Sequence, residues 1–330
     1  MTPQLRLRLV VVAAEATTIA VTWPLWQVRE TPPLLPLCEL PPLDFAAPLL
    51  ACLALALRWP TLGALLHTVV LALAMLADQT REQAPFVSFA ILLWAAAPHR
   101  GAVAVGALHL IALWFWSGLG KLTSPGFLGH GGAWLLGSDA GEPTAAGIAV
   151  AVALGLAELL LAVAACTSRW RTRAALAAAL LHLGILAFLV ARGANAAVWA
   201  WNAALAVAAP LLLRAAPVPA WPVPGTRVPR IAAVAFVLLP LGFHAGAVDA
   251  PFAMQVYTRN EPRAVLLGAG GRSERVLYLS ELRVPLPPVP RIQRQWFLRS
   301  GRRGERLALL EPRPLARWLG ARDELLAVSP

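Results

Sequence analysis

The sequence contains little charge and almost no lysine. Only 14% of its 330 residues are charged, whereas 58% are hydrophobic, and the mean hydropathy is +0.66. A soluble domain needs a polar surface and carries about a quarter charged residues, so a single soluble globular domain is excluded. Cysteine is also scarce, and Cys38, Cys52 and Cys166 show no CxxC spacing. This argues against a disulfide framework and against redox or zinc motifs.

The charge that is present is unevenly distributed. Residues 1–248 hold 9 acidic and 14 basic residues, and residues 249–330 hold 8 acidic and 14 basic residues. We therefore expect a transmembrane domain over 1–248 and a small basic C-terminal domain over 249–330. The net charge of +11 does not indicate nucleic-acid binding, because the arginines before residue 249 stand singly at the ends of apolar runs. The expected partner of this region is the lipid bilayer.

Long apolar runs predict an all-α polytopic membrane protein with about nine transmembrane helices. A helix needs roughly 17–25 apolar residues to cross the hydrocarbon. The candidate spans are 8–26, 44–58, 60–77, 85–98, 101–120, 143–166, 174–191, 195–213 and 230–247. The second and fourth runs are short, so one of them is expected to be tilted, re-entrant or longer than drawn. Arg6 and Arg8 before the first run resemble the start of a signal peptide, but Glu15 within it favours a retained helix.

The loop charges predict an orientation. One set of helix ends is purely basic, with arginines at 6, 8, 58, 100, 169, 171, 173, 214, 227 and 230. The opposite set is mixed or acidic and includes Arg29, Asp78, Glu82 and Glu142. The positive-inside rule assigns the basic set to the cytoplasm. We expect a multi-pass cell-membrane protein with a cytoplasmic N-terminus and an extracytoplasmic C-terminal domain.

The C-terminal region has a different pattern. Two short β-prone stretches, 263–269 and 275–279, are joined by glycines and predict a hairpin. Prolines at 285, 287, 288 and 290 indicate a stiff connector, and residues 316–326 are expected to form a short helix. The C-terminal domain is therefore predicted to be small and partly β.

Lys121 is the only lysine in the sequence, which contains 27 arginines. A polar group at membrane depth costs several kcal/mol unless it is partnered, so such residues are functional candidates. Trp114 and Ser117 share a helix face with Lys121, and Gly118 and Gly120 thin the helix beside it. Lysine, unlike arginine, can lose its proton when it is desolvated. The alternative is a lysine that snorkels at a helix end and favours the helix dipole.

Other polar residues also allow two interpretations. Asn195, Trp199 and Asn202 are spaced like one helical stripe, which indicates either ligand contacts or an interfacial tryptophan with interhelical amide bonds. Asp78 and Arg81 lie one turn apart and are able to pair with each other.

The histidines predict no metal site. His67, His109 and His182 fall on three different helices, without the close spacing of metal ligands. Such histidines more often serve in helix packing than as ligands.

Three motifs and the start of the C-terminal region resemble one membrane-protein family. Residues 114–122 (WFWSGLGKL), followed by Phe127, resemble the lysine motif of the horizontally transferred transmembrane (HTTM) domain. This is the membrane domain of vitamin K-dependent gamma-carboxylases and their bacterial relatives. Residues 78–83 (DQTREQ), 195–202 (NAAVWAWN) with His182 in the preceding helix, and 252–257 (FAMQVY) are similar to an uncharacterised bacterial branch. The resemblance implies a helical domain in which a conserved lysine deprotonates reduced vitamin K, and it places that role on Lys121.

Together these observations give a working hypothesis. We expect an outward-facing intramembrane pocket around Lys121, with Asp78 and His182 as further catalytic candidates. The expected ligand-binding residues are Arg81, Gln83, Trp114, Ser117, Asn195, Trp199 and Asn202. The ligand would be a lipophilic small molecule such as a quinone or quinol, and no metal is expected.

Two other classes of function remain open at this stage. In a non-enzymatic binding or assembly protein, the same polar groups would only hold helices together. A transporter is less favoured, because the sequence shows no repeat symmetry and no paired broken helices.

Overall fold

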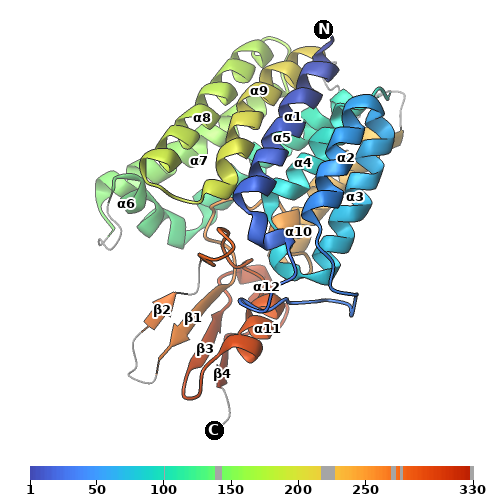
Figure 1. Cartoon of the computed structure of the whole chain (residues 1–330). Coiled ribbons are helices and arrows are strands. Elements are labelled where there is room, and N and C mark those ends of the chain that lie inside the picture. The colour runs from blue at the N-terminus through green and yellow to red at the C-terminus, as the bar shows by residue number, and fades with distance from the viewer. Residues whose placement is uncertain (100, 138–142, 217–226, 269–272, 276–277, 328–330) are drawn as a thin grey trace.

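The computed structural model consists of a helical bundle with a small sheet-containing domain at one end (Figure 1). It describes all residues except 100, 138–142, 217–226, 269–272, 276–277 and 328–330. The N-terminus lies at the end of the bundle that is remote from the C-terminal domain (Figure 1). Arg100 and Glu142, which were predicted to lie at helix ends, are outside the described residues.

The described part of the bundle has a helix at each of the nine predicted ranges. These helices are α1 (Pro3–Val21), α2 (Ala46–Arg58), α3 (Pro60–Ala77), α4 (Ala84–Ala95), α5 (Ala102–Thr123), α7 (Ala145–Ala165), α8 (Arg171–Ala191), α9 (Trp199–Ala215) and α10 (Arg227–His244). A short α6 (Gly132–Leu135) lies between α5 and α7. Six of these segments, α3, α5, α7, α8, α9 with its preceding turn, and α10, are long and apolar enough to cross a membrane. This confirms the prediction of a membrane-embedded helical protein.

The prediction of nine complete spans is not confirmed. The 13 residues of α2 and the 12 residues of α4 are apolar, but at 1.5 Å per residue they reach only about 20 Å. The hydrocarbon core of a bilayer is about 30 Å thick. The third remaining helix, α1, carries Arg6, Arg8 and Glu15 among its 19 residues. These three helices therefore fall outside the six that qualify by length and composition.

The arginines at the end remote from the C-terminal domain cap helix termini. Arg8 donates to the carbonyl oxygens of Leu57, at the end of α2, and Ala96, after α4, at 3.4 and 3.1 Å. Arg171 Nε donates to the carbonyl of Leu213, near the end of α9, at 2.6 Å. The last carbonyls of a helix have no partner within the helix, so these side chains satisfy them. The contacts place several of the predicted basic ends on one side of the bundle.

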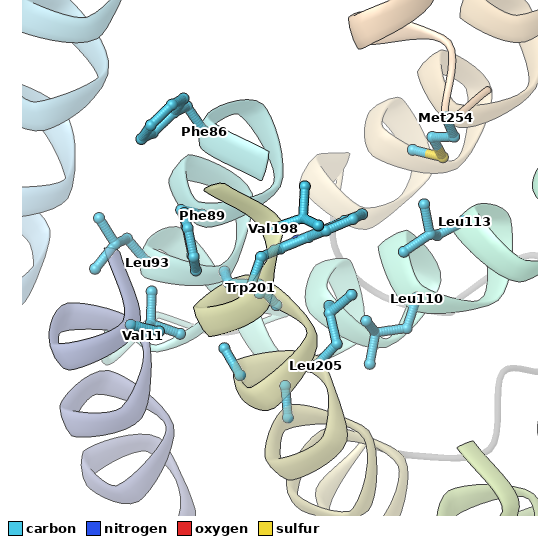
Figure 2. Close-up of a cluster of buried hydrophobic side chains, with 14 of the residues drawn as sticks. Val11, Phe86, Phe89, Leu93, Leu110, Leu113, Val198, Trp201, Leu205 and Met254 are labelled. Atoms are coloured by element: carbon cyan, nitrogen blue, oxygen red, sulfur yellow. The ribbon is translucent and has the colours of Figure 1, made fainter. Parts of the chain in front are cut away.

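The centre of the bundle is built around α9. Trp201 and Leu205 of α9 lie close to Val11 of α1, Phe89 of α4 and Leu110 of α5 (Figure 2). All five side chains are buried, with at most 3% exposure. Small residues on α9, among them Ala204, Ala208 and Ala209, are also fully buried, and such residues let membrane helices approach closely.

The C-terminal domain pairs a helix with an antiparallel sheet. Its elements are β1 (Arg263–Leu267), β2 (Ser273–Arg275), α11 (Pro290–Ser300), β3 (Arg306–Leu310), α12 (Pro314–Trp318) and β4 (Glu324–Ala327). The strand order is β2-β1-β3-β4, with Val265 opposite Arg275 and Ala308. Phe297 of α11 is fully buried against Ala264, Leu307 and Leu309 of the sheet. The predicted hairpin is confirmed in the described residues.

One expectation for this domain is wrong, and the end of another is shifted by one residue. The helix predicted over 316–326 is instead the five-residue α12 followed by the edge strand β4, in which Leu326 pairs with Leu307 of β3. Pairing with an available sheet edge outweighs weak local helix preference. The last proline of the expected stiff connector, Pro290, begins α11, a position that suits proline because a first-turn residue needs no N–H partner.

Candidate functional site

The site begins at a close crossing of α5 and α7. A Cβ added to Gly118 would lie 2.7 Å from the carbonyl oxygen of Gly155, and one added to Gly155 would lie 2.8 Å from Leu122. Only glycine therefore permits this approach of the two backbones. The two helices run antiparallel here, because Gly118 meets Glu158 and Leu159 whereas Gly155 meets Leu122. The side chain of Lys121 extends back by one turn of α5, past Ser117, and reaches Glu158. The crossing thus brings the lysine and the glutamate together.

Lys121 and Glu158 form a buried ion pair. Lys121 Nζ lies 2.8 and 3.0 Å from the two carboxylate oxygens of Glu158, and the two residues are 3% and 5% exposed. Nζ also donates to Ser117 Oγ at 2.5 Å and to the carbonyl of Val256 at 3.2 Å. An ammonium has three hydrogens to donate, and here all three have acceptors. Lys121 therefore does not snorkel toward headgroups, and its counter-ion is Glu158.

The segment over residues 254–260, which has an unusual backbone, supplies one of these acceptors. Met254, Tyr257 and Arg259 all have positive φ, at 56°, 55° and 56°, although none of them is glycine. Such residues cost of order 1–3 kcal/mol each and persist where the surroundings fix them. Two side chains anchor the segment to α5, since Ser117 Oγ contacts Val256 O at 3.2 Å and Asn260 Nδ2 donates to Gly120 O at 2.7 Å. The segment closes the end of α5 over Lys121.

A chain of hydrogen bonds lies beside the ion pair. Trp114 Nε1 donates to His182 Nε2 at 3.1 Å, so the imidazole proton belongs on Nδ1. That Nδ1 lies 3.1 Å from Asn202 Oδ1, and Asn202 Nδ2 donates to the carbonyl of Val198 at 3.0 Å. All three linked side chains are buried. The relay fixes a neutral His182 tautomer and joins α5, α8 and α9.

These groups surround a cavity of about 410 Å³. Its polar lining comes from Ser117, Lys121, Glu158, His182, Asn202 and Tyr257. Its remaining lining is apolar or aromatic and includes Leu113, Trp134, Leu154, Leu180, Ile185 and Phe188. The volume is within the range of about 300–1,000 Å³ in which proteins bind small molecules. Of the predicted site residues, the structure places Lys121, Trp114, Ser117, His182 and Asn202 together here.

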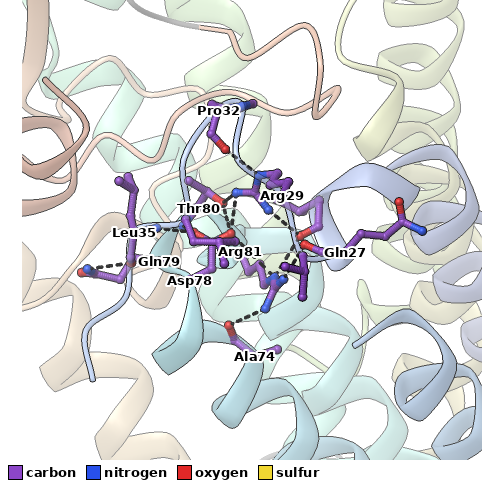
Figure 3. A network of polar contacts seen from close by, with 12 residues as sticks. Gln27, Arg29, Pro32, Leu35, Ala74, Asp78, Gln79, Thr80 and Arg81 are labelled. Carbon is purple, nitrogen blue, oxygen red and sulfur yellow. Dashed lines mark hydrogen bonds and ion pairs between the residues drawn. The ribbon is translucent and has the colours of Figure 1, made fainter. Parts of the chain in front are cut away.

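Asp78 has different partners from those expected. It receives hydrogen bonds from Arg29 at 2.5 Å, from the Thr80 hydroxyl at 2.7 Å and from the Leu35 amide at 3.1 Å (Figure 3). Asp78 is fully buried and does not line the cavity around Lys121. The prediction that Asp78 lies in the site around Lys121 is therefore wrong. The carboxylate of Asp78 is instead paired with Arg29, which lies 49 residues earlier in the sequence.

Arg81 and Gln83 also form hydrogen bonds outside the cavity. Arg81 donates to the carbonyls of Leu25, Ala74 and Gln27 at 2.9, 3.2 and 3.3 Å, and its Nε lies 3.8 Å from Asp78 (Figure 3). Its guanidinium also stacks over Phe45, 4.9 Å from the ring centroid. Gln83 Nε2 donates to the carbonyl of Pro285 at 2.9 Å. Neither residue lines the Lys121 cavity.

The loop that contains these residues is a docking platform for the C-terminal domain. Gln79 Nε2 donates to Gln295 of α11 at 2.7 Å, and Arg291 of α11 donates to Glu82 at 3.0 Å. Arg291 also bonds Asp249. Burial raises the pKa of Glu82 to about 7, against the opposing effect of the hydrogen bond from Arg291. The motif 78–83 thus joins the bundle to α11.

Asn195 and Trp199, which were predicted to bind the ligand, do not line the cavity. Asn195 has a left-handed backbone with φ of 41°, and α9 begins only at Trp199, so the expected helical stripe with Asn202 does not form. Asn195 Nδ2 instead donates to the hydroxyl of Tyr257, a cavity residue, at 3.0 Å. Trp199 Nε1 donates to the carbonyl of Ala194 at 2.8 Å and holds the turn.

Glu158 was missed as the partner of Lys121. No counter-ion on α7 was predicted for Lys121. Gly118 and Gly155, which lie near Lys121 and Glu158 in the sequence, are small residues of the kind that allow two membrane helices to approach closely. Within the described residues, no group of three or more His, Cys, Asp or Glu side chains is arranged to hold a metal ion.

The fold and the site define a helical membrane protein with an internal ion pair beside an apolar cavity. Comparison with protein-family models, with curated proteins and with solved structures gives no match.

Proposed function

We propose that this protein is an integral membrane protein of the HTTM type. It would bind a lipophilic ligand with a compact, hydrogen-bonding head, such as a quinol, in the cavity beside Lys121. The observation that carries the proposal is the buried Lys121–Glu158 pair at the polar end of an otherwise apolar cavity. Buried ion pairs often contribute little net stability, so their presence needs another reason. The resemblance of residues 114–122 to the lysine motif of the carboxylases supports the same role.

The pair offers a route for a proton. The ammonium of Lys121 gives one proton to the Glu158 carboxylate, which leaves a neutral amine and a neutral acid. The amine then accepts the proton of a quinol hydroxyl. The products are a quinolate, an ammonium beside it and a protonated Glu158, so the total charge of the site is unchanged. The short distances of 2.8 and 3.0 Å between Nζ and the carboxylate oxygens support direct transfer.

Ligand retention tests the proposal. Nanodiscs that contain the purified protein are loaded with a polyisoprenyl naphthoquinone, reduced with dithionite, and extracted in mild detergent on an affinity resin. The retained quinone is then quantified by chromatography. Lys121→Met and Glu158→Gln should lower retention at least about tenfold, equivalent to 1.4 kcal/mol. Arg294→Met, which removes an exposed pair with Glu324, is the matched control. Equal retention by all variants would contradict a ligand site at Lys121.

Lys121→Arg separates binding from proton transfer. Arginine keeps the positive charge but cannot be deprotonated in a protein. We expect this variant to fold and to retain ligand, but not to complement a strain that lacks the gene. Full complementation would remove the role as a base.

A second function is favoured by one specific observation. All three hydrogens of Lys121 already have acceptors within the protein, as expected if the pair only holds α5, α7 and the 254–260 segment together. In that case the protein is a non-enzymatic membrane binding or assembly protein. Normal quinone retention and normal complementation by a well-folded Lys121→Met/Glu158→Gln double variant would favour this second function.

A further inference from the structure

The end of the cavity that faces the C-terminal domain is covered by a segment that hydrogen bonds hold in place. Val256 and Tyr257 line that end. The carbonyl of Val256 is held by Lys121 and Ser117, each at 3.2 Å, and Asn260 is bound to the end of α5. A ligand that arrived from this side would have to break these hydrogen bonds.

The flank formed by α8 is different. Leu180 and Gly184 line the cavity and are also exposed on the outside of α8, with Leu180 70% exposed. A Cβ added to Gly184 would meet nothing within 4 Å. On the same outer surface Leu183 is 49% exposed, and Leu160 of the neighbouring α7 is 66% exposed. Because both helices are long and apolar enough to cross a membrane, this surface faces lipid chains.

We propose that the cavity opens sideways into the bilayer between α7 and α8, beside Gly184. The ligand is then a membrane-resident lipid, with a compact hydrogen-bonding head at Lys121 and a long hydrocarbon chain that leaves through this mouth. This inference rests on the proposed function and names its ligand class and route.

The shape and chemistry of the cavity define the ligand further. Leu180, Gly184 and Phe188 follow one another at intervals of four residues, so they form a continuous apolar stripe along α8 on both sides of the mouth. A volume of about 410 Å³ is near the lower limit for a drug-sized ligand, so a long chain must extend outside. The stripe offers only apolar contacts and does not distinguish an isoprenoid chain from an acyl chain.

Photolabelling with matched probes tests the route. Three photoreactive naphthoquinones are used in proteoliposomes, one without a chain, one with a long isoprenyl chain and one with a long acyl chain. Labelled peptides are identified by mass spectrometry. Gly184→Trp should lower cavity labelling by both long-chain probes at least about tenfold, a change of 1.4 kcal/mol in effective affinity. Labelling by the chainless probe, which is small enough to pass a narrowed mouth, should change less than about twofold.

Controls make each outcome decisive. Leu183→Trp places the same bulk on the lipid-facing surface of α8 but outside the cavity lining, and it should label like the wild type. If Gly184→Trp does not fold, Leu180→Trp blocks the mouth from the preceding turn. Unchanged long-chain labelling in a folded Gly184→Trp or Leu180→Trp variant would overturn the lateral route. Absence of labelling by every probe in the wild type would instead overturn the proposed function, and the lateral route with it.

Discussion

Removal of one partner of the Lys121–Glu158 pair should be much more costly than removal of both. Lys121→Met keeps most of the apolar stem but leaves the Glu158 carboxylate, which is 5% exposed, without a cation. Breaking a buried pair in this way costs about 3–5 kcal/mol, because the remaining charge is desolvated and uncompensated. Glu158→Gln leaves the ammonium in the same position. We expect each single variant to lose about 3 kcal/mol of the free energy of unfolding, at the lower end of that range.

The double variant Lys121→Met/Glu158→Gln contains no uncompensated charge. It should lie within about 2 kcal/mol of the wild type, because well-packed uncharged replacements of a buried pair are often close to neutral. The coupling energy of the cycle, which is the sum of the two single losses less the loss of the double variant, is then at least about 4 kcal/mol, above the values usual for residues in contact. The free energy of unfolding is measured by SDS titration in mixed micelles or by steric trapping in bilayers.

The pair between Arg294 and Glu324 provides the comparison. Its side chains are 38% and 44% exposed, so the same cycle there should give a coupling energy below about 1 kcal/mol. If the losses of the two Lys121–Glu158 single variants simply add in the double variant, the two residues do not act as a pair. The lysine would then be a separate, solvated group, and the account of the site would be wrong.

Three further predictions concern the loops and the orientation. Arg81→Lys removes the planar guanidinium that donates to three carbonyls, so it should lower the free energy of unfolding by about 2–3 kcal/mol and leave quinone retention unchanged. Loss of quinone retention at normal stability would show instead that Arg81 belongs to the ligand site. Burial raises the pKa of Glu82 from 4.5 to about 7, so the native state keeps a proton that the unfolded chain releases, and the free energy of unfolding should fall as the pH rises through this window. Glu82→Gln should flatten that slope, and an unchanged slope would refute the assignment. Single cysteines that replace Arg169, Arg227 and Arg302, all exposed, should react with an impermeant maleimide in intact cells only at 302; labelling at 169 without 302 would invert the orientation.

Much of the bundle follows from the sequence because the requirement for a membrane helix is local. A run of apolar residues of sufficient length satisfies its own backbone, so the helical ranges need no knowledge of partners. The shared face of Trp114, Ser117 and Lys121 was predictable for the same reason, since all three lie on the uninterrupted α5. The stripe that began at Asn195 failed because the backbone is left-handed at that residue and α9 starts four residues later.

The pairing of charges was less predictable because it depends on contacts between distant elements. Nothing near Asp78 in the sequence indicates that Arg29 fills its carboxylate, and nothing near Lys121 indicates Glu158. The sequence of either helix alone does not show at which residues α5 and α7 cross. α11 was not predicted for a similar reason. One of its faces is polar, and the helix packs on the sheet and on the 78–83 loop, which are distant in the sequence.

The most direct test of the central claim is a cryo-EM structure of the protein extracted from its native membrane in mild detergent or native nanodiscs, together with mass spectrometry of the bound lipids. The account predicts elongated density in the cavity, with a compact head within hydrogen-bonding distance of Lys121 or Glu158 and a chain that leaves between α7 and α8 beside Gly184. The same preparation of Lys121→Met/Glu158→Gln should lose this density and the corresponding lipid. An empty cavity in the wild type, with the Lys121–Glu158 pair intact and no co-purified lipid that has a hydrogen-bonding head, would contradict the claim.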